Sequence, residues 1–180
     1  MSTASKAIFV TGGARSGKSL FAEKRALEFG APLGYLATAQ SFDAEMDQRI
    51  TRHQLRRGDA WTTIEEPLNL AQALSEQDGR FSAILVDCLT LWLTNLLLQH
   101  GEPGEEAVRQ VMAEVNRLAD TVAAMTTPVI IVSNEVGMGI VPENRLARVF
   151  RDVAGEANQI TALTADEAWL VASGLPLRLK

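Results

Sequence analysis

Residues 12–19, Gly-Gly-Ala-Arg-Ser-Gly-Lys-Ser, combine residue types and a spacing that can bind the phosphates of a nucleotide. The pattern G-x-x-x-x-G-K-[ST] is complete, with its fixed positions at Gly12, Gly17, Lys18 and Ser19. Glycines let backbone N–H groups approach phosphate oxygens closely, and the start of the following helix adds positive potential. We expect Lys18 to reach the β- and γ-phosphates and Ser19 to ligate Mg²⁺. The segment predicts a P-loop for a nucleoside triphosphate, and the competing interpretation is a glycine-rich turn without a ligand.

A carboxylate further along the chain could complete the magnesium site. Asp87 ends the apolar run Ala-Ile-Leu-Val-Asp at 83–87, which is typical of a buried strand. In P-loop proteins a carboxylate at the end of a neighbouring strand holds the magnesium. Asp87 also precedes an apolar helical stretch, so capping that helix is its alternative role. Beside a P-loop, the magnesium role is favoured.

A histidine in a basic stretch could act as a nucleophile toward phosphorus. His53 is accompanied by four arginines: Arg49, Arg52, Arg56 and Arg57. Their charges would stabilise phosphate oxygens and keep the imidazole neutral, which is its nucleophilic form. A solvated basic helix with a surface histidine explains the same spacing, so the residues alone leave both interpretations open. His100 lies in a polar loop with glycine and proline, where an exposed and inert role is expected.

The elements that must position these groups alternate along the chain. Four short apolar runs predict strands: 7–11, 33–37, 83–87 and 129–133. Apolar residues at helical spacing predict helices at 17–29, 43–57, 89–99 and 105–125, and from Pro142 to about residue 163. Segments 168–173 and 176–180 predict a strand–turn–strand. Because nearly all-apolar strands alternate with helices, residues 1–180 are expected to form one α/β domain with a mostly parallel sheet and helices on both faces.

Composition excludes several classes of partner. The 180 residues carry a net charge of −5, which argues against a nucleic-acid partner. The most apolar stretch, 89–98, contains two threonines and one asparagine and is shorter than the roughly 20 residues of a membrane span, so no transmembrane segment is expected. A single cysteine, Cys88, suits a reducing cytoplasm, where we expect the protein.

The chain resembles the bifunctional adenosylcobinamide kinase / adenosylcobinamide-phosphate guanylyltransferase family of cobalamin biosynthesis. The resemblance extends over nearly the whole chain, through VTGGARSGKS, YLATAQ, the histidine segment at 45–57, W-x-T-x-E, LVDCLT and TNLL. Its most specific part is the block NEVGMGIVPENRLARVFRD followed by AG-x-x-NQ at 134–159. The ending SGLPL-x-LK completes it.

The resemblance implies an enzyme with two steps. Adenosylcobinamide is first phosphorylated with ATP or GTP, and GMP from GTP then passes through a guanylyl-histidine to the adenosylcobinamide phosphate, giving adenosylcobinamide-GDP. The family's nucleophile falls on His53, and Lys18 is the other catalytic residue expected. The resemblance also implies a RecA-like fold and a homotrimer.

The same matching assigns nucleotide contacts to three stretches and two single carboxylates. They are Gly12, Gly13, Ala14, Arg15, Ser16, Gly17, Lys18, Ser19, Ala37, Thr38, Ala39, Gln54, Leu55, Arg56, Arg57, Glu65 and Asp87. Position 39 is Ala where relatives carry Ser.

Other features have two interpretations each. Glu135, Glu143 and Asn144 follow a strand end, where they could touch the corrinoid or the nucleotide, or could belong to a structural loop. The stripe Arg145, Arg148 and Arg151 is interpreted as a solvated or intersubunit face rather than a set of phosphate ligands. The apolar helix around Trp92 could be core or a trimer interface, with core favoured.

Two other functions compete with this interpretation. A plain P-loop kinase would dispense with His53. A regulatory GTPase is expected to carry Asn-Lys-x-Asp after a late strand, whereas here Asn134 is followed by Glu-Val-Gly. The sequence therefore argues against a GTPase of that kind.

Overall fold

A single seven-stranded sheet organises the chain in the computed structural model, which describes residues 7–39, 58–99 and 104–180. The strand order is β3-β2-β4-β5-β1-β6-β7. The strands are β1 (Ala7–Gly12), β2 (Leu33–Ala37), β3 (Trp61–Glu65), β4 (Ala83–Asp87), β5 (Val129–Asn134), β6 (Glu167–Ala172) and β7 (Leu175–Arg178). All neighbouring pairs are parallel except the β6–β7 hairpin. The carboxyl ends of six strands therefore meet at one edge.

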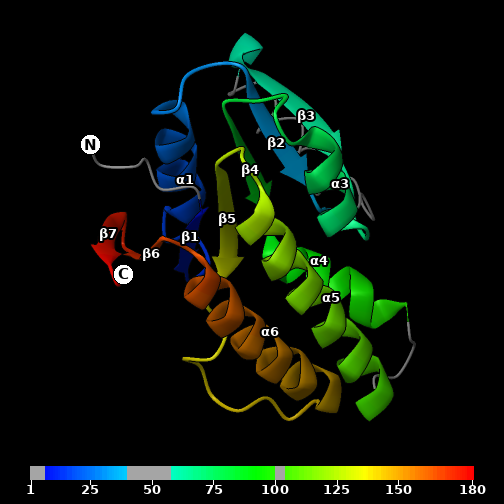
Figure 1. Ribbon diagram of the computed structural model, residues 1–180. Helices are drawn as coiled ribbons and strands as arrows, with labels where there is room; N and C mark the ends of the chain where they lie inside the picture. Colours follow the sequence, from blue (N-terminus) through cyan, green and yellow to red (C-terminus); the bar gives the residue numbers. More distant parts are fainter. Residues whose placement is uncertain (1–6, 40–57, 100–103) are drawn as a thin grey trace.

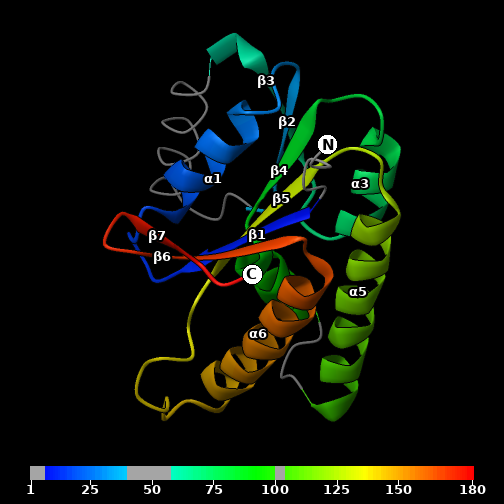
Figure 2. The same cartoon turned by 60° about the vertical axis from the view of Figure 1, so that its left-hand side comes forward.

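Helices cover the two faces of this sheet unequally (Figure 1). The helices are α1 (Lys18–Leu27), α3 (Leu70–Gln77), α4 (Leu89–Leu98), α5 (Glu105–Ala124) and α6 (Arg145–Thr164), with a short 3-10 turn η1 (Gly58–Ala60). Among the described elements, α1 alone lies on one face, and α3 to α6 lie on the other (Figure 2). The fold class expected from the sequence, an α/β domain with a mostly parallel sheet, is confirmed.

Alternating strand residues build a core on each face. Phe9 packs with the residues of α3 to α6, whereas Ile8 and Val10 pack with α1. Trp92 is fully buried among the four helices, and its Nε1 donates to the carbonyl oxygen of Leu68 at 2.7 Å. Within one chain, this tryptophan is therefore a core residue, as favoured from the sequence.

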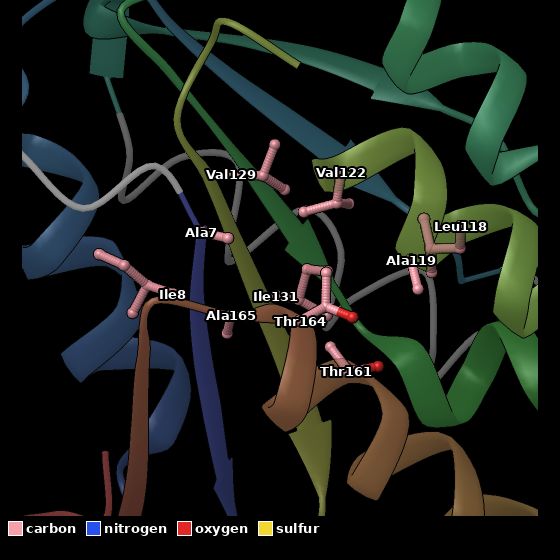
Figure 3. A pocket seen from close by; sticks show the side chains of 10 residues that line it. All are labelled: Ala7, Ile8, Leu118, Ala119, Val122, Val129, Ile131, Thr161, Thr164 and Ala165. Atoms are coloured by element: carbon pink, nitrogen blue, oxygen red, sulfur yellow. The ribbon is translucent and has the colours of Figure 1, made fainter. Parts of the chain in front are cut away.

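A small cavity between α5, α6, β1 and β5 is too small for a substrate (Figure 3). Its volume is about 10 Å³, which is room for roughly one water molecule. Its lining includes Ala7 and Val129, the first residues of their strands, so it lies at the edge opposite the carboxyl ends. The cavity is a packing defect of the core and not a candidate active site.

A strand and a helix were missing from the sequence-based prediction, and the start of another helix was wrong. Strand β3 and helix α3 lie between Gly58 and Phe81, where no element was expected. Helix α6 begins at Arg145 rather than at Pro142, because Asn144 Oδ1 accepts a hydrogen bond from the Ala147 N–H at 3.1 Å and caps the helix. The helix expected at 43–57 lies outside the described residues. No described helix is long and apolar enough to cross a membrane.

Candidate active site

The P-loop connects the carboxyl end of β1 to the start of α1 in close contact with its surroundings. A Cβ atom on Gly12 would lie 2.3 Å from the Val171 carbonyl oxygen and 2.6 Å from Ser16 Oγ. Gly17 has φ +94°, a left-handed conformation that glycine adopts without strain, and it is the N-terminal cap residue of α1. Its position carries no side-chain cap, so phosphate oxygens could satisfy the N–H groups of the first turn. Glycine is thus required at both positions, at Gly12 by the close approach of β6 and at Gly17 by the left-handed backbone.

Lys18 is folded back over this loop. Its side chain is largely buried, and Nζ donates to the Gly13 carbonyl oxygen at 3.2 Å. The ammonium group therefore lies against the backbone of the loop, with the neutral Gly13 carbonyl among its partners. A triphosphate could replace this acceptor with charged oxygens, which bind an ammonium group more strongly.

Asp87 and Lys18 bring opposite charges to the end of β4. Burial, together with the negative charge of Asp87, raises the pKa of the adjacent Cys88 thiol from 9.0 to about 11, and the positive charge of Lys18 acts in the opposite direction. Both charges therefore lie within electrostatic range of the Cys88 thiol, at the carboxyl edge of the sheet.

A tyrosine that the sequence interpretation did not single out orients Asp87. Tyr35, on the neighbouring strand β2, donates its hydroxyl to Asp87 Oδ2 at 2.9 Å. Asp87 is not the N-terminal cap of α4. Cys88 occupies that position, and its side chain makes no capping hydrogen bond. The carboxylate is half-buried and held by a neutral donor, an arrangement that suits a metal ligand.

Ser19 and Asp87 carry oxygen donors of the kind that a magnesium ion binds. Mg²⁺ takes hard oxygen ligands and commonly uses one or two protein groups, with water and phosphate oxygens in its other positions. Ser19 supplies a hydroxyl in the first turn of α1, and Asp87 supplies a carboxylate. Among the residues that the structure describes, no group of three or more His, Cys, Asp or Glu could form an all-protein metal site. The donors present therefore suit a metal that arrives with the nucleotide.

Three strand ends place further expected residues in a row. Ala37 pairs in register with Glu65 on one side and with Asp87 on the other. Glu65 is exposed at this edge. These carboxylates thus flank the end of β2, although they are 22 positions apart in the sequence.

Thr38 uses its polar atoms inside the protein. Its hydroxyl donates to the Cys88 carbonyl oxygen at 2.8 Å and accepts from the Cys88 N–H at 2.9 Å. Its N–H donates to the Asp87 carbonyl oxygen at 3.2 Å, and its own carbonyl accepts from Asn95 Nδ2 at 2.8 Å. Thr38 therefore fixes the end of β2 to the start of α4, and Ala39, which follows it, is the last described residue before the gap.

The histidine segment is not described. His53, Gln54, Leu55, Arg56 and Arg57 lie outside the described residues, so their expected roles stay predictions.

The loop between β5 and α6 is tied to the P-loop by its backbone. Asn134 pairs in register with Gly12, and the Glu135 N–H donates to the Gly12 carbonyl oxygen at 3.0 Å. Asn134 Nδ2 donates to Thr90 Oγ1 at 2.7 Å, which links β5 to the start of α4. Glu135 Oε1 accepts from the Gly137 N–H at 2.6 Å. This loop therefore borders the site. The Glu135 carboxylate stabilises the conformation of the loop itself.

The arginine stripe contains one residue with a clear structural role. Arg148 donates through Nη1 to the carbonyl oxygens of Pro142 and Glu143, at 3.0 and 2.5 Å. Arg145 is exposed, and Arg151 Nε lies 3.8 Å from Asp152 Oδ1. Arg148 thus shapes the loop before α6, a function that its helical spacing did not indicate.

Comparisons with solved structures show the fold. The flagellar accessory protein FlaH from Methanocaldococcus jannaschii is 15% identical, with a TM-score of 0.52, and the alignment covers 97% of this chain and 78% of that one. The RadB recombinase is 14% identical with the same TM-score, and the alignment covers 91% and 73%. At these identities the likeness concerns the α/β architecture alone.

Comparisons with curated proteins show the family. Proteins named bifunctional adenosylcobalamin biosynthesis protein are 42% identical in Pseudomonas aeruginosa (CobP), 42% in Escherichia coli (CobU) and 45% in Salmonella typhimurium (CobU). The alignments cover 95% of this chain and 95% of the Pseudomonas protein, and 96% and 99% for each of the other two. The family model described as cobinamide kinase / cobinamide phosphate guanyltransferase matches residues 8–179. The chain therefore belongs to the cobinamide kinase / cobinamide phosphate guanyltransferase family.

Proposed function

We propose that this chain phosphorylates adenosylcobinamide and then guanylylates the product, using one P-loop for both reactions. The observation that carries the proposal is the complete P-loop at the carboxyl edge of the sheet, with Lys18 folded back over it, in a chain of this family. The substrates are adenosylcobinamide, its phosphate, ATP and GTP.

In the kinase step, the hydroxyl of the aminopropanol arm attacks the γ-phosphorus of ATP or GTP. A P–O bond to the acceptor forms, the bond from the γ-phosphorus to the bridging oxygen breaks, and the nucleoside diphosphate leaves. Lys18 would exchange the Gly13 carbonyl for phosphate oxygens and stabilise the charge on the transferred group. Mg²⁺ would neutralise phosphate charge when bound, and Ser19 and Asp87 are the residues that would hold it.

In the guanylyl step, an imidazole nitrogen of His53 attacks the α-phosphorus of GTP and releases pyrophosphate. An oxygen of adenosylcobinamide phosphate then attacks the same phosphorus, the P–N bond breaks, and free His53 is restored. The nucleotide contacts proposed are residues 12–19, 37–39, 54–57, Glu65 and Asp87. The register that sets Glu65 and Asp87 on either side of the end of β2 supports this assignment.

We further propose that the enzyme is a cytoplasmic homotrimer. A buried free thiol at Cys88 suits a reducing compartment. In the loop before α6, Met138 is 80% exposed and Ile140 is 97% exposed, which is unusual for apolar side chains unless an assembly covers them. Sedimentation equilibrium should give three times the chain mass of 19.5 kDa, and a monomer at micromolar concentration would contradict the trimer.

Labelling with GTP that is radioactive at its α-phosphate tests the mechanism. Wild-type protein without corrinoid should retain label after denaturation, and the bond should be cleaved in acid and survive in base, as expected of a phosphoramidate. His53→Ala should lose the label but still phosphorylate adenosylcobinamide with ATP, whereas the matched variant His100→Ala should keep both activities. Label on His53→Ala, or no label on active wild-type protein, would refute the guanylyl-histidine.

A further inference from the structure

The turn of the C-terminal hairpin lies directly against the P-loop. The Gly174 N–H donates to the Ser16 carbonyl oxygen at 2.8 Å, although the two residues are 158 positions apart. A Cβ atom on Gly17 would lie 3.2 Å from Gly174 Cα, and one on Gly12 would overlap the Val171 carbonyl oxygen. The backbone of the hairpin therefore packs on the backbone of the P-loop at both motif glycines, as the position of β7 near the start of α1 also shows (Figure 2).

The conformation of this turn is unusual and specific. Ala172 pairs with Leu175, which leaves Ser173 and Gly174 as the two turn residues. Both have positive φ, 53° and 80°, the pattern of a type I′ hairpin turn. The position of the Gly174 N–H thus depends on two residues in the left-handed region.

The hairpin is itself anchored on both sides. Toward α1, Arg25 forms an ion pair with Glu167 at 3.0 Å, and the ring of Phe21 lies 5.2 Å from that of Trp169. Toward α6, Lys180 Nζ donates to a carbonyl oxygen just past the helix end at 2.6 Å, where the helix dipole also favours a cation. The hairpin can therefore act as a fixed support for the loop.

We propose that the Ser173–Gly174 turn positions the P-loop for phosphate binding. The C=O of Ser16 and the N–H of Gly17 belong to one trans peptide plane, in which they point in opposite directions. Fixing the Ser16 carbonyl toward Gly174 turns the Gly17 N–H away from the hairpin, toward the side of the loop open to a phosphate. Gly174 is thus a positioning residue for the nucleotide, and the inference rests on the proposed function only in taking the P-loop as the nucleotide site.

Matched glycine substitutions test this role. Gly79, in the turn between α3 and β4, is the control position. It has φ +77° and open space where a Cβ would lie, and its N–H donates to Thr127 Oγ1 at 2.7 Å. Like Gly174, it therefore combines a positive φ with a backbone N–H that makes a hydrogen bond to a distant residue. Gly174→Val and Gly79→Val should therefore lower the melting temperature by similar amounts. Gly174→Asn is the conservative variant, since asparagine tolerates positive φ.

The readout is the dissociation constant of GTP and of ATP, measured by calorimetry without corrinoid. We expect Gly174→Val to weaken nucleotide binding at least about tenfold, equal to about 1.4 kcal/mol, and to raise the kinase KM for nucleotide more than it lowers kcat. Gly79→Val should bind within about twofold of wild type, and Gly174→Asn should restore affinity. Wild-type affinity in Gly174→Val, or equal losses in both valine variants, would overturn the proposal.

Two further features keep the test decisive. If a valine variant does not fold, the pair Gly174→Ala and Gly79→Ala applies the same comparison with less strain. Because binding is measured without corrinoid, a failure of the proposed corrinoid chemistry would leave wild-type nucleotide binding intact and would not be confused with a failure of the positioning role.

Discussion

Replacing Gly12 with alanine should disable the P-loop by moving its backbone. An alanine Cβ would lie 2.3 Å from the Val171 carbonyl oxygen, whereas ordinary Cβ contacts begin at 3.4 Å, so β1 and β6 must separate locally by about 1.1 Å. The second clash, 2.6 Å from Ser16 Oγ, is with a side chain, which can rotate, so the contact with the Val171 backbone decides the effect. Overpacking of this size costs about 1–3 kcal/mol of stability.

The functional cost should be large as well. A displacement of roughly 1 Å in a site that orients phosphates can reduce the rate by about 100-fold. We therefore expect Gly12→Ala to fold, to melt a few degrees lower, and to lose about 100-fold in kcat/KM for phosphorylation of adenosylcobinamide. Steady-state kinetics and calorimetric titration with ATP measure this directly.

Gly13→Ala is the matched comparison, because a Cβ at that position meets no atom within 4 Å. Its kinetics should change far less, by about twofold, as expected of a substitution without new contacts. The steric reasoning would be refuted if Gly12→Ala retained nucleotide affinity within about threefold of wild type, or if Gly13→Ala proved equally damaging.

Three further predictions concern the hydrogen bonds and the thiol around the sheet. Tyr35→Phe removes the donor to Asp87 and should cost about 0.5–1.5 kcal/mol in transition-state stabilisation, measured as a fall in kcat of about two- to thirteenfold at unchanged melting temperature. Asp78 lies at the opposite edge of the sheet. Partial burial raises the pKa of this carboxyl group, but hydrogen bonds from Thr127 and Thr126 outweigh that effect and lower the pKa from 3.8 to about 2. These hydrogen bonds therefore stabilise the folded protein above pH 3.8, and their contribution is lost as the pH falls toward 2. After discounting for solvent exposure, Asp78→Asn should cost about 1 kcal/mol in urea unfolding at pH 7, with the difference from wild type shrinking below pH 3. With a pKa of about 11, the Cys88 thiol should be about one-thousandth thiolate at pH 8 and should react with iodoacetamide only after unfolding.

Local patterns in the sequence predicted most of the fold. The apolar runs gave the strands β1, β2, β4 and β5 almost to the residue, because each is buried on both faces. Strand β3 was not predicted because it lies at the edge of the sheet, where much of it is exposed and its sequence is not an apolar run. Helix α3 has only eight residues, which is shorter than the window in which a helical period can be recognised. The start of α6 could have been predicted from Asn144, because asparagine is a stronger signal as an N-terminal cap than proline is as a first-turn residue.

Some residues of the candidate site could be predicted from the sequence, and others could not. The P-loop was predicted because its spacing in the chain is its signal, and Asp87 was singled out because it ends an apolar run. Tyr35 and Gly174 were not singled out, since each acts on a residue distant in the sequence, and only the sheet order brings them to their partners. Thr38 was expected beside the nucleotide, but a sequence cannot show that hydrogen bonds to the start of α4 occupy its polar atoms.

We expect one P-loop to hold the triphosphate for attack at two different phosphorus atoms. The decisive experiment is Lys18→Ala, assayed by chromatography of the corrinoid products. Supplied with adenosylcobinamide and ATP, and separately with adenosylcobinamide phosphate and GTP, the variant should lose both phosphorylation and guanylylation, each by at least about 100-fold. Guanylylation at the wild-type rate alongside lost phosphorylation would show that the two reactions use separate nucleotide sites, and would contradict the account.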